Sequence, residues 1–178
     1  MAKPEIGIRR ASAGDENALA VVGAATFLES FIDQITGPDL IQHCQSQHAP
    51  EAYLAYLSAT DPRYACWLVE YLPTGVPIGY GVTCPPDLPV DGLAGDIELK
   101  RIYSFSKFHG SGAGRLISEA ADAYGLSLGC TRILLGTYKG NARAIAFYHR
   151  EGYRQIGTRA FHVGKQVYDD IVMAKPLV

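Results

Sequence analysis

The segment His109-Gly110-Ser111-Gly112-Ala113-Gly114-Arg115 joins a predicted strand to a predicted helix. Glycines let the backbone approach a ligand closely, and the start of a helix offers unpaired N–H groups with a partial positive charge. Such a segment is typical of a pyrophosphate-binding loop. The alternative is a glycine-rich turn that only packs tightly against a sheet.

Two common classes of phosphate-binding loop are disfavoured by the residues of this segment. A Walker loop ends in Gly-Lys-Ser/Thr, whereas Gly114 is followed by Arg115 and Leu116. A dinucleotide fingerprint has the spacing Gly-x-Gly-x-x-Gly. Gly110 and Gly112 fit this spacing, but Arg115 occupies the position of the third glycine. The sequence therefore argues against nucleotide hydrolysis and nicotinamide chemistry.

Outward from this loop, the chain alternates between strand and helix patterns. Asp15 is expected to cap the first helix with its side chain. The predicted strands are 5–10, 65–71, 77–84, 96–104, 132–137, 153–163 and 167–174. The predicted helices are 15–30, 38–47, 50–59, 112–128 and 141–151. With no repeat and no linker, residues 1–178 are predicted to form a single α/β domain around a central sheet.

The composition restricts the class of protein. Hydrophobic residues make up 48 % of the 178 residues, which is enough for a full core, and the formal net charge is -2. This charge argues against a nucleic acid partner and allows a cationic substrate. The absence of a signal-like or membrane-length apolar segment, together with four scattered cysteines, predicts a cytoplasmic protein with no membrane partner. His43, Cys44 and His48 form one weak zinc candidate without a second ligand pair, so no metal site is expected.

A second motif lies downstream, where Asn141-Ala142-Arg143-Ala144-Ile145-Ala146-Phe147-Tyr148 is followed by Glu151-Gly152-Tyr153. With this motif the chain resembles the GNAT superfamily of N-acetyltransferases. The family's Arg/Gln-x-x-Gly-x-Gly/Ala loop matches His109, Gly112 and Gly114, and its Asn-x-x-Ala-x-x-Phe-Tyr segment matches the second motif. The specific resemblance covers residues 96–153. The chain departs from the pattern at His109, where arginine or glutamine is usual, and at Ser104, where an apolar residue is common.

The resemblance implies a GNAT-like fold: a mixed, mostly antiparallel sheet of about seven strands flanked by helices. It also implies an enzyme that uses acetyl-CoA as co-substrate, without a metal, to acetylate an amine in a ternary complex. The backbones of Ile102 and Ser104 would pair with the pantetheine arm. The loop from His109 to Arg115, with Gly110, Ser111, Gly112, Ala113 and Gly114 between them, would wrap the pyrophosphate. For these residues the alternative is plain sheet and turn structure.

Three further residues have roles implied by the resemblance. Asn141 would contact the cofactor arm, and it equally fits a simple helix cap. Tyr148 would lie near the sulfur of CoA and protonate the departing thiolate; otherwise it is a core aromatic. Glu98 stands where some family members carry a general base, which removes a proton from the ammonium directly or through water. The alternative is that Glu98 faces solvent or forms a salt bridge, for example with Lys100 or Arg101. His109 would make cofactor binding weaker or sensitive to pH, because histidine titrates near pH 6.5.

The acceptor is expected at residues 26–31 and 161–170, where Glu29, Asp33, Asp169 and Asp170 either attract a cation or are ordinary surface charges. A soft similarity to the bacterial polyamine acetyltransferase branch ranks small polyamines first, ahead of amino sugars, amino-acid derivatives and protein N-termini. Two other functions stay open: a non-catalytic acyl-CoA-binding or sensing module, and acetylation of protein N-termini or lysines. A homodimer is the default for this family.

Overall fold

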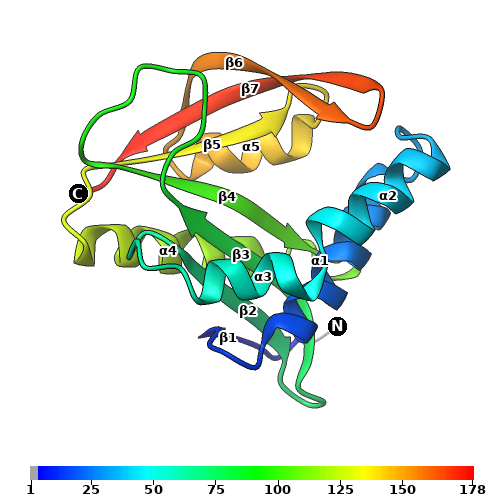
Figure 1. The fold of residues 1–178 in the computed structure, drawn as a ribbon. Coiled ribbons are helices and arrows are strands. Elements are labelled where there is room, and N and C mark those ends of the chain that lie inside the picture. The colour runs from blue at the N-terminus through cyan, green and yellow to red at the C-terminus, as the bar shows by residue number, and fades with distance from the viewer. Residues whose placement is uncertain (1–3) are drawn as a thin grey trace.

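The computed structural model describes residues 4–178, which form one seven-stranded sheet with helices on both faces (Figure 1). The strands are β1 (Ile6–Arg10), β2 (Ala65–Tyr71), β3 (Val76–Cys84), β4 (Asp96–Ser104), β5 (Arg132–Tyr138), β6 (Arg154–Val163) and β7 (Gln166–Pro176). The helices are α1 (Glu16–Phe31), α2 (Gly37–Gln47), α3 (Pro50–Leu57), α4 (Ala113–Ser127) and α5 (Ala142–Arg150). The predicted mixed, mostly antiparallel sheet is confirmed: the order is β1-β2-β3-β4-β5-β7-β6, and only β4 and β5 run parallel.

The two parallel strands separate part of the way along the sheet. They pair only from Asp96 with Arg132 to Glu98 with Leu134, although β4 continues to Ser104 and β5 to Tyr138. Figure 1 shows the strands diverging beyond this point. The backbone groups of β4 that face β5 therefore have no strand partner over the last part of β4, and such groups need another partner when they are shielded from water.

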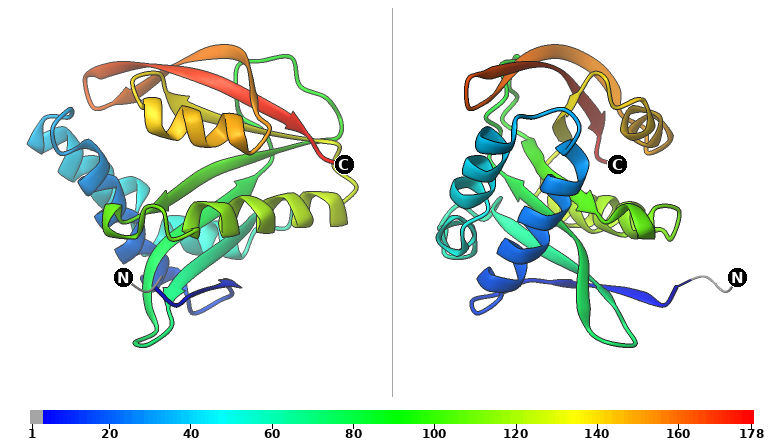
Figure 2. Two further views of the ribbon diagram at one scale, coloured as in Figure 1. Left: turned by 180° about the vertical axis from the view of Figure 1, so that it is seen from behind. Right: turned by 90° about the vertical axis from the view of Figure 1, so that its right-hand side faces the viewer.

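Helices cover both faces of the sheet (Figure 2). On one face α4 packs through Ile117 and Ala121 onto Ile97, Leu99 and Ile133 of the central strands. On the other face α1 and α3 pack onto β2 and β3, with a core made of Leu19, Val22, Tyr53, Leu68 and Tyr80. Hydrophobic burial on both faces holds the central strands rigidly in place.

The hairpin of β6 and β7 closes one end of the molecule against the segment that links α1 and α2. Val163 from the hairpin shares a small core with Phe27, Ile35 and Leu40. Two hydrogen bonds reinforce the contact: the Tyr168 hydroxyl donates to the Gln34 carbonyl (3.1 Å), and the Thr36 amide donates to the Gln166 side chain (3.3 Å).

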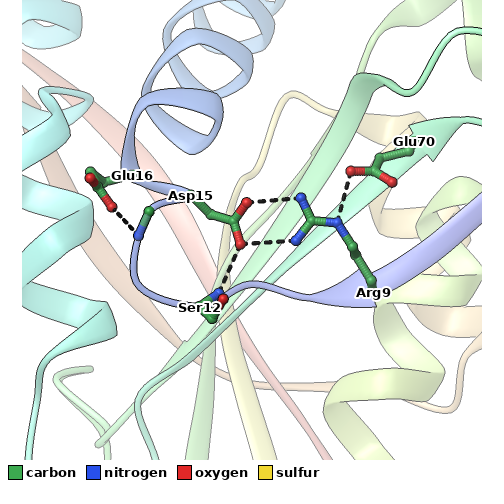
Figure 3. Close-up of polar contacts among 6 residues, drawn as sticks. Arg9, Ser12, Asp15, Glu16 and Glu70 are labelled. Carbon is green, nitrogen blue, oxygen red and sulfur yellow. Dashed lines mark hydrogen bonds and ion pairs between the residues drawn. The ribbon is translucent and has the colours of Figure 1, made fainter.

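Every predicted strand and helix is present, with ends shifted by no more than two residues. The prediction that the Asp15 side chain caps α1 is wrong, although Asp15 occupies the cap position. Its carboxylate instead accepts two hydrogen bonds from Arg9 (2.8 and 2.9 Å) and one from the Ser12 amide (2.9 Å), while Arg9 also donates to Glu70 (Figure 3). The competing bidentate arginine partner comes from β1, so the spacing within the helix could not reveal it.

The four cysteines are free thiols, as predicted. Among the helices of residues 4–178, none has the length and the apolar content that crossing a membrane requires.

Candidate active site

A cavity of about 980 Å³ opens between the diverging ends of β4 and β5. Its walls come from β4, β5, α1, α2, α5, the β6–β7 hairpin and the glycine loop that precedes α4. Most of the predicted site residues meet on these walls: Ile102, Ser104, His109, Gly110, Gly112, Ala113, Gly114, Arg115, Asn141 and Tyr148. Glu98 and Ser111 do not lie on them.

The glycine loop presents free backbone donors to this cavity. Gly110 and Gly112 have positive φ angles of 82° and 102°, which side chains other than glycine rarely adopt. The amide N–H groups of Gly110, Gly112, Gly114 and Arg115 donate to no acceptor within residues 4–178. Free N–H groups at the start of α4 suit an anion such as a pyrophosphate.

Ser111 supports the loop from behind. It is 5 % exposed, its amide donates to the Phe108 carbonyl (3.1 Å), and its hydroxyl accepts from the Ala113 amide (3.3 Å). The amide of Ser111 is therefore engaged within the loop, and its contact with the cofactor stays a prediction.

His109 contacts Arg143, a residue that the motif comparison did not single out. Nδ1 of His109 faces a guanidinium nitrogen of Arg143, and Nε2 lies 3.2 Å from the Ser104 carbonyl oxygen. Burial, followed by the charge of Arg143, lowers the pKa of His109, so the ring is neutral at pH 7. Any pH dependence from His109 is thus expected below pH 6.5. Arg143 therefore places a positive charge beside His109 at the glycine loop.

Asn141 caps α5. Its side-chain oxygen accepts a hydrogen bond from the Ala144 amide at 3.1 Å. Asn141 also lies on the cavity wall, so the capping interpretation is confirmed and the cofactor contact stays a prediction.

Tyr148 lies on the cavity wall and is 7 % exposed. Its ring packs edge-on against Phe147 and Tyr153, while its hydroxyl has no hydrogen-bond partner within residues 4–178. Burial raises the pKa of Tyr148, so the phenol stays protonated at neutral pH. A protonated hydroxyl without a protein partner can donate to a ligand in the cavity.

Glu98 is 2 % exposed and lies behind the cavity wall. Its carboxylate accepts a hydrogen bond from the Asp87 amide at 2.8 Å and so holds the loop between β3 and β4. The alternative of a salt bridge to Lys100 or Arg101 is wrong, because neither forms an ion pair with Glu98. Burial raises the pKa of Glu98, which makes this carboxylate a stronger base than an exposed glutamate.

Aromatic side chains surround the end of the cavity that the β6–β7 hairpin covers. They are Phe27, Phe31, Tyr103, Phe161 and Tyr168. His43 stacks on Phe27 with ring centroids 4.2 Å apart, and His48 shares a hydrogen bond with the Tyr53 hydroxyl (2.8 Å). Burial and the nearby Arg101 charge lower the pKa of His43 to about 4 and that of His48 to about 3, so both rings are neutral at pH 7.

The former zinc candidate is part of this aromatic packing. The Cys44 thiol donates a hydrogen bond to the Ala24 carbonyl oxygen (3.7 Å), so it does not form a metal site with the two histidines. Within residues 4–178, no group of three or more His, Cys, Asp or Glu side chains is arranged to hold a metal ion.

The acidic residues expected to attract a cation are engaged elsewhere or paired. Glu29 accepts hydrogen bonds from the amide and hydroxyl of Ser106, and Asp33 is exposed. Asp169 pairs with Lys139 on the surface. Of these four residues, only Asp170 lies on the cavity wall, and Arg159 neutralises it at 2.6 Å. The expectation of an acidic pocket for a cation is therefore not supported by the structure.

Comparisons with known proteins agree with this geometry. The model of the acetyltransferase (GNAT) family matches residues 29–153. Uncharacterized N-acetyltransferases of Mycobacterium bovis and Mycobacterium tuberculosis are 29 % identical over 164 residues, which is 92 % of this chain and 99 % of theirs. The PaiA N-acetyltransferase from Thermoplasma acidophilum, solved in complex with coenzyme A, superimposes with a TM-score of 0.73 at 16 % identity, covering 97 % of this chain and 99 % of that one. The ribosomal-protein-S18-alanine N-acetyltransferase from Escherichia coli gives a TM-score of 0.64 at 17 % identity, covering 97 % and 94 %.

Proposed function

The chain belongs to the GNAT family of acetyltransferases and is an acetyl-CoA-dependent N-acetyltransferase, and from this premise we propose that its acceptor is the primary amine of a small molecule. The observation that carries the proposal is the cavity between the diverging strands, which joins free backbone donors at one end to a covered aromatic chamber at the other. Because the β6–β7 hairpin packs onto the α1–α2 segment, the chamber suits a small amine better than a folded protein.

The fit to acetyl-CoA rests on backbone groups. The amides of Gly110, Gly112, Gly114 and Arg115 have no protein acceptor within residues 4–178 and suit the pyrophosphate. The unpaired edge of β4 near Ile102 and Ser104 suits the amides of the pantetheine arm, which would lie alongside like an added strand. Asn141 and Arg143 flank this path.

The acceptor amine would attack the thioester carbonyl directly, forming a C–N bond as the C–S bond breaks. Placement of both substrates supplies much of the rate. We assign the proton donated to the departing thiolate to Tyr148, which is protonated and lines the cavity. We assign removal of the ammonium proton to Glu98 acting through water, since its carboxylate lies behind the wall.

Replacing Tyr148 with phenylalanine should lower kcat about tenfold and leave CoA affinity unchanged. The effect is modest because a thiol with a pKa near ~8.5 is already a tolerable leaving group. Single-turnover thiol release measures the chemical step. Phe147→Leu is the control, because it changes a neighbouring aromatic on the same wall without removing a proton donor. Equal kcat in the Tyr148→Phe and wild-type enzymes would show that Tyr148 serves only in packing.

The proposal as a whole is tested by two measurements on the wild-type protein. CoA should raise the melting temperature, whereas ATP and NAD should not, because only a ligand that binds the native state stabilises it. Thiol release from acetyl-CoA should then depend on an added small amine. Stabilisation by ATP and not by CoA would overturn the assignment of the glycine loop. CoA binding without release for any amine would favour an acyl-CoA-sensing module.

A further inference from the structure

Arg101 is a buried cation that lacks an acidic partner within residues 4–178. It lies on β4, is 9 % exposed, and lines the cavity at its covered end. Its Nη1 atom is buried and makes no hydrogen bond, and no Asp or Glu of the described chain forms an ion pair with it. A guanidinium remains charged in a protein, so this side chain has a charge without an acidic partner and an Nη1 donor without an acceptor.

The surroundings of Arg101 do not compensate this charge. The rings of Tyr53 and Tyr56 lie 5.2 and 5.6 Å from the guanidinium carbon and provide cation–π contacts. Such contacts attract a cation, but they offset only part of the cost of burying a charge that has no ionic partner. The nearby rings of His43 and His48 are neutral at pH 7 and supply no negative charge.

The other charged residues at this end of the cavity do not change its net charge. Asp170 is already paired with Arg159 at 2.6 Å, so that pair is neutral as a whole. The covered chamber thus holds a net positive charge among aromatic walls formed by Phe27 and Tyr103. A polycation would be repelled there, whereas a carboxylate would meet the unused donors in the bidentate geometry that guanidinium groups favour.

We propose that Arg101 binds a carboxylate of the acceptor, so that the acceptor class is amino acids with apolar side chains rather than polyamines. This inference rests on the proposed acetyl transfer to a small amine. The carboxylate would contact the guanidinium, the apolar side chain would pack on the aromatic walls, and the amine would remain free to attack the thioester. Arg101 is then a specificity-determining residue that contacts the substrate.

The test uses pairs of amines that differ only in the carboxylate: phenylalanine with phenethylamine, and leucine with isopentylamine, with spermidine added. Thiol release from acetyl-CoA by the wild-type protein should give a kcat/KM at least about tenfold higher for the carboxylated member of each pair. Higher kcat/KM for the decarboxylated amines or for spermidine would overturn the carboxylate site and leave the proposed acetyl transfer intact.

Arg101→Met should abolish this preference while CoA affinity stays unchanged. Its melting temperature should not fall, since removing an uncompensated buried charge removes a cost, whereas a purely structural arginine would destabilise the fold when lost. Arg63→Met is the matched control, because Arg63 is paired with Asp61 at 2.7 Å away from the cavity. A preference that survives in folded Arg101→Met would contradict the proposal.

If no amine releases thiol, the proposed acetyl transfer to small amines fails, and thermal shifts with CoA present decide the carboxylate site separately. Stabilisation of the wild type by phenylalanine or leucine, but not of Arg101→Met, would uphold the site. No stabilisation by either amino acid would overturn it as well.

Discussion

Gly112→Asp should reduce CoA affinity at least about a hundredfold and remove the rise in melting temperature that CoA produces. Gly112 has a φ of 102° at the cap position of α4, and its amide is one of the free donors that face the cavity. An aspartate would place a carboxylate beside the phosphates and strain the left-handed backbone by about 1–3 kcal/mol. Isothermal titration with CoA measures the loss.

The effect of charge at the loop can be separated from the effect of backbone strain. Gly129 follows the other end of α4, also has a positive φ of 76°, and has open space where the Cβ atom of a side chain would lie. Gly129→Asp therefore introduces the same residue into a similar backbone conformation outside the cavity. It should lower the melting temperature comparably and leave CoA affinity unchanged. Equal affinity in the two folded variants would refute the pyrophosphate assignment.

The elements of the fold could be predicted from the sequence because each depends on local patterns. The glycine loop and the alternating apolar residues of 96–104 determine structure within a few positions, and the sheet contains every strand they predicted. The separation of β4 from β5 beyond Glu98 could not be predicted in this way. It depends on how two strands that are distant in the sequence meet, and no local pattern predicts where their pairing stops.

The candidate site could be predicted where it depends on local sequence, but not where it depends on pairing between distant elements. The backbone donors of the glycine loop depend only on local sequence, and the motif correctly predicted a loop whose Gly110 and Gly114 line the cavity. The net charge at the acceptor end depends on pairing between distant elements. Arg159 of β6 neutralises Asp170 of β7, and Glu29 accepts a hydrogen bond from Ser106. Arg101 has no acidic partner within residues 4–178. The sequence left open whether Glu29, Asp169 and Asp170 attract a cation or are ordinary charges, and their pairing with other residues favours the second interpretation.

Glu98→Gln should lower kcat/KM about a hundredfold or more at neutral pH without weakening CoA binding. An alkylammonium with a pKa of about 10.4 costs roughly 4–5 kcal/mol to deprotonate at pH 7, so a base has a large task here. Glutamine can still accept the hydrogen bond from the Asp87 amide, which preserves the loop between β3 and β4. An unchanged melting temperature would show that the structural role of residue 98 is intact.

The pH dependence identifies the base. The raised pKa of Glu98 means that the active, ionised carboxylate forms only above the usual range for glutamate, so the wild-type kcat/KM should rise through that pKa and then level off. Without the base, the rate should follow the fraction of neutral amine and climb about tenfold per pH unit toward the pKa of the amine. The deficit of Glu98→Gln should therefore shrink as the pH rises. A deficit that is constant with pH would assign Glu98 to holding the loop and leave the ammonium proton to water alone.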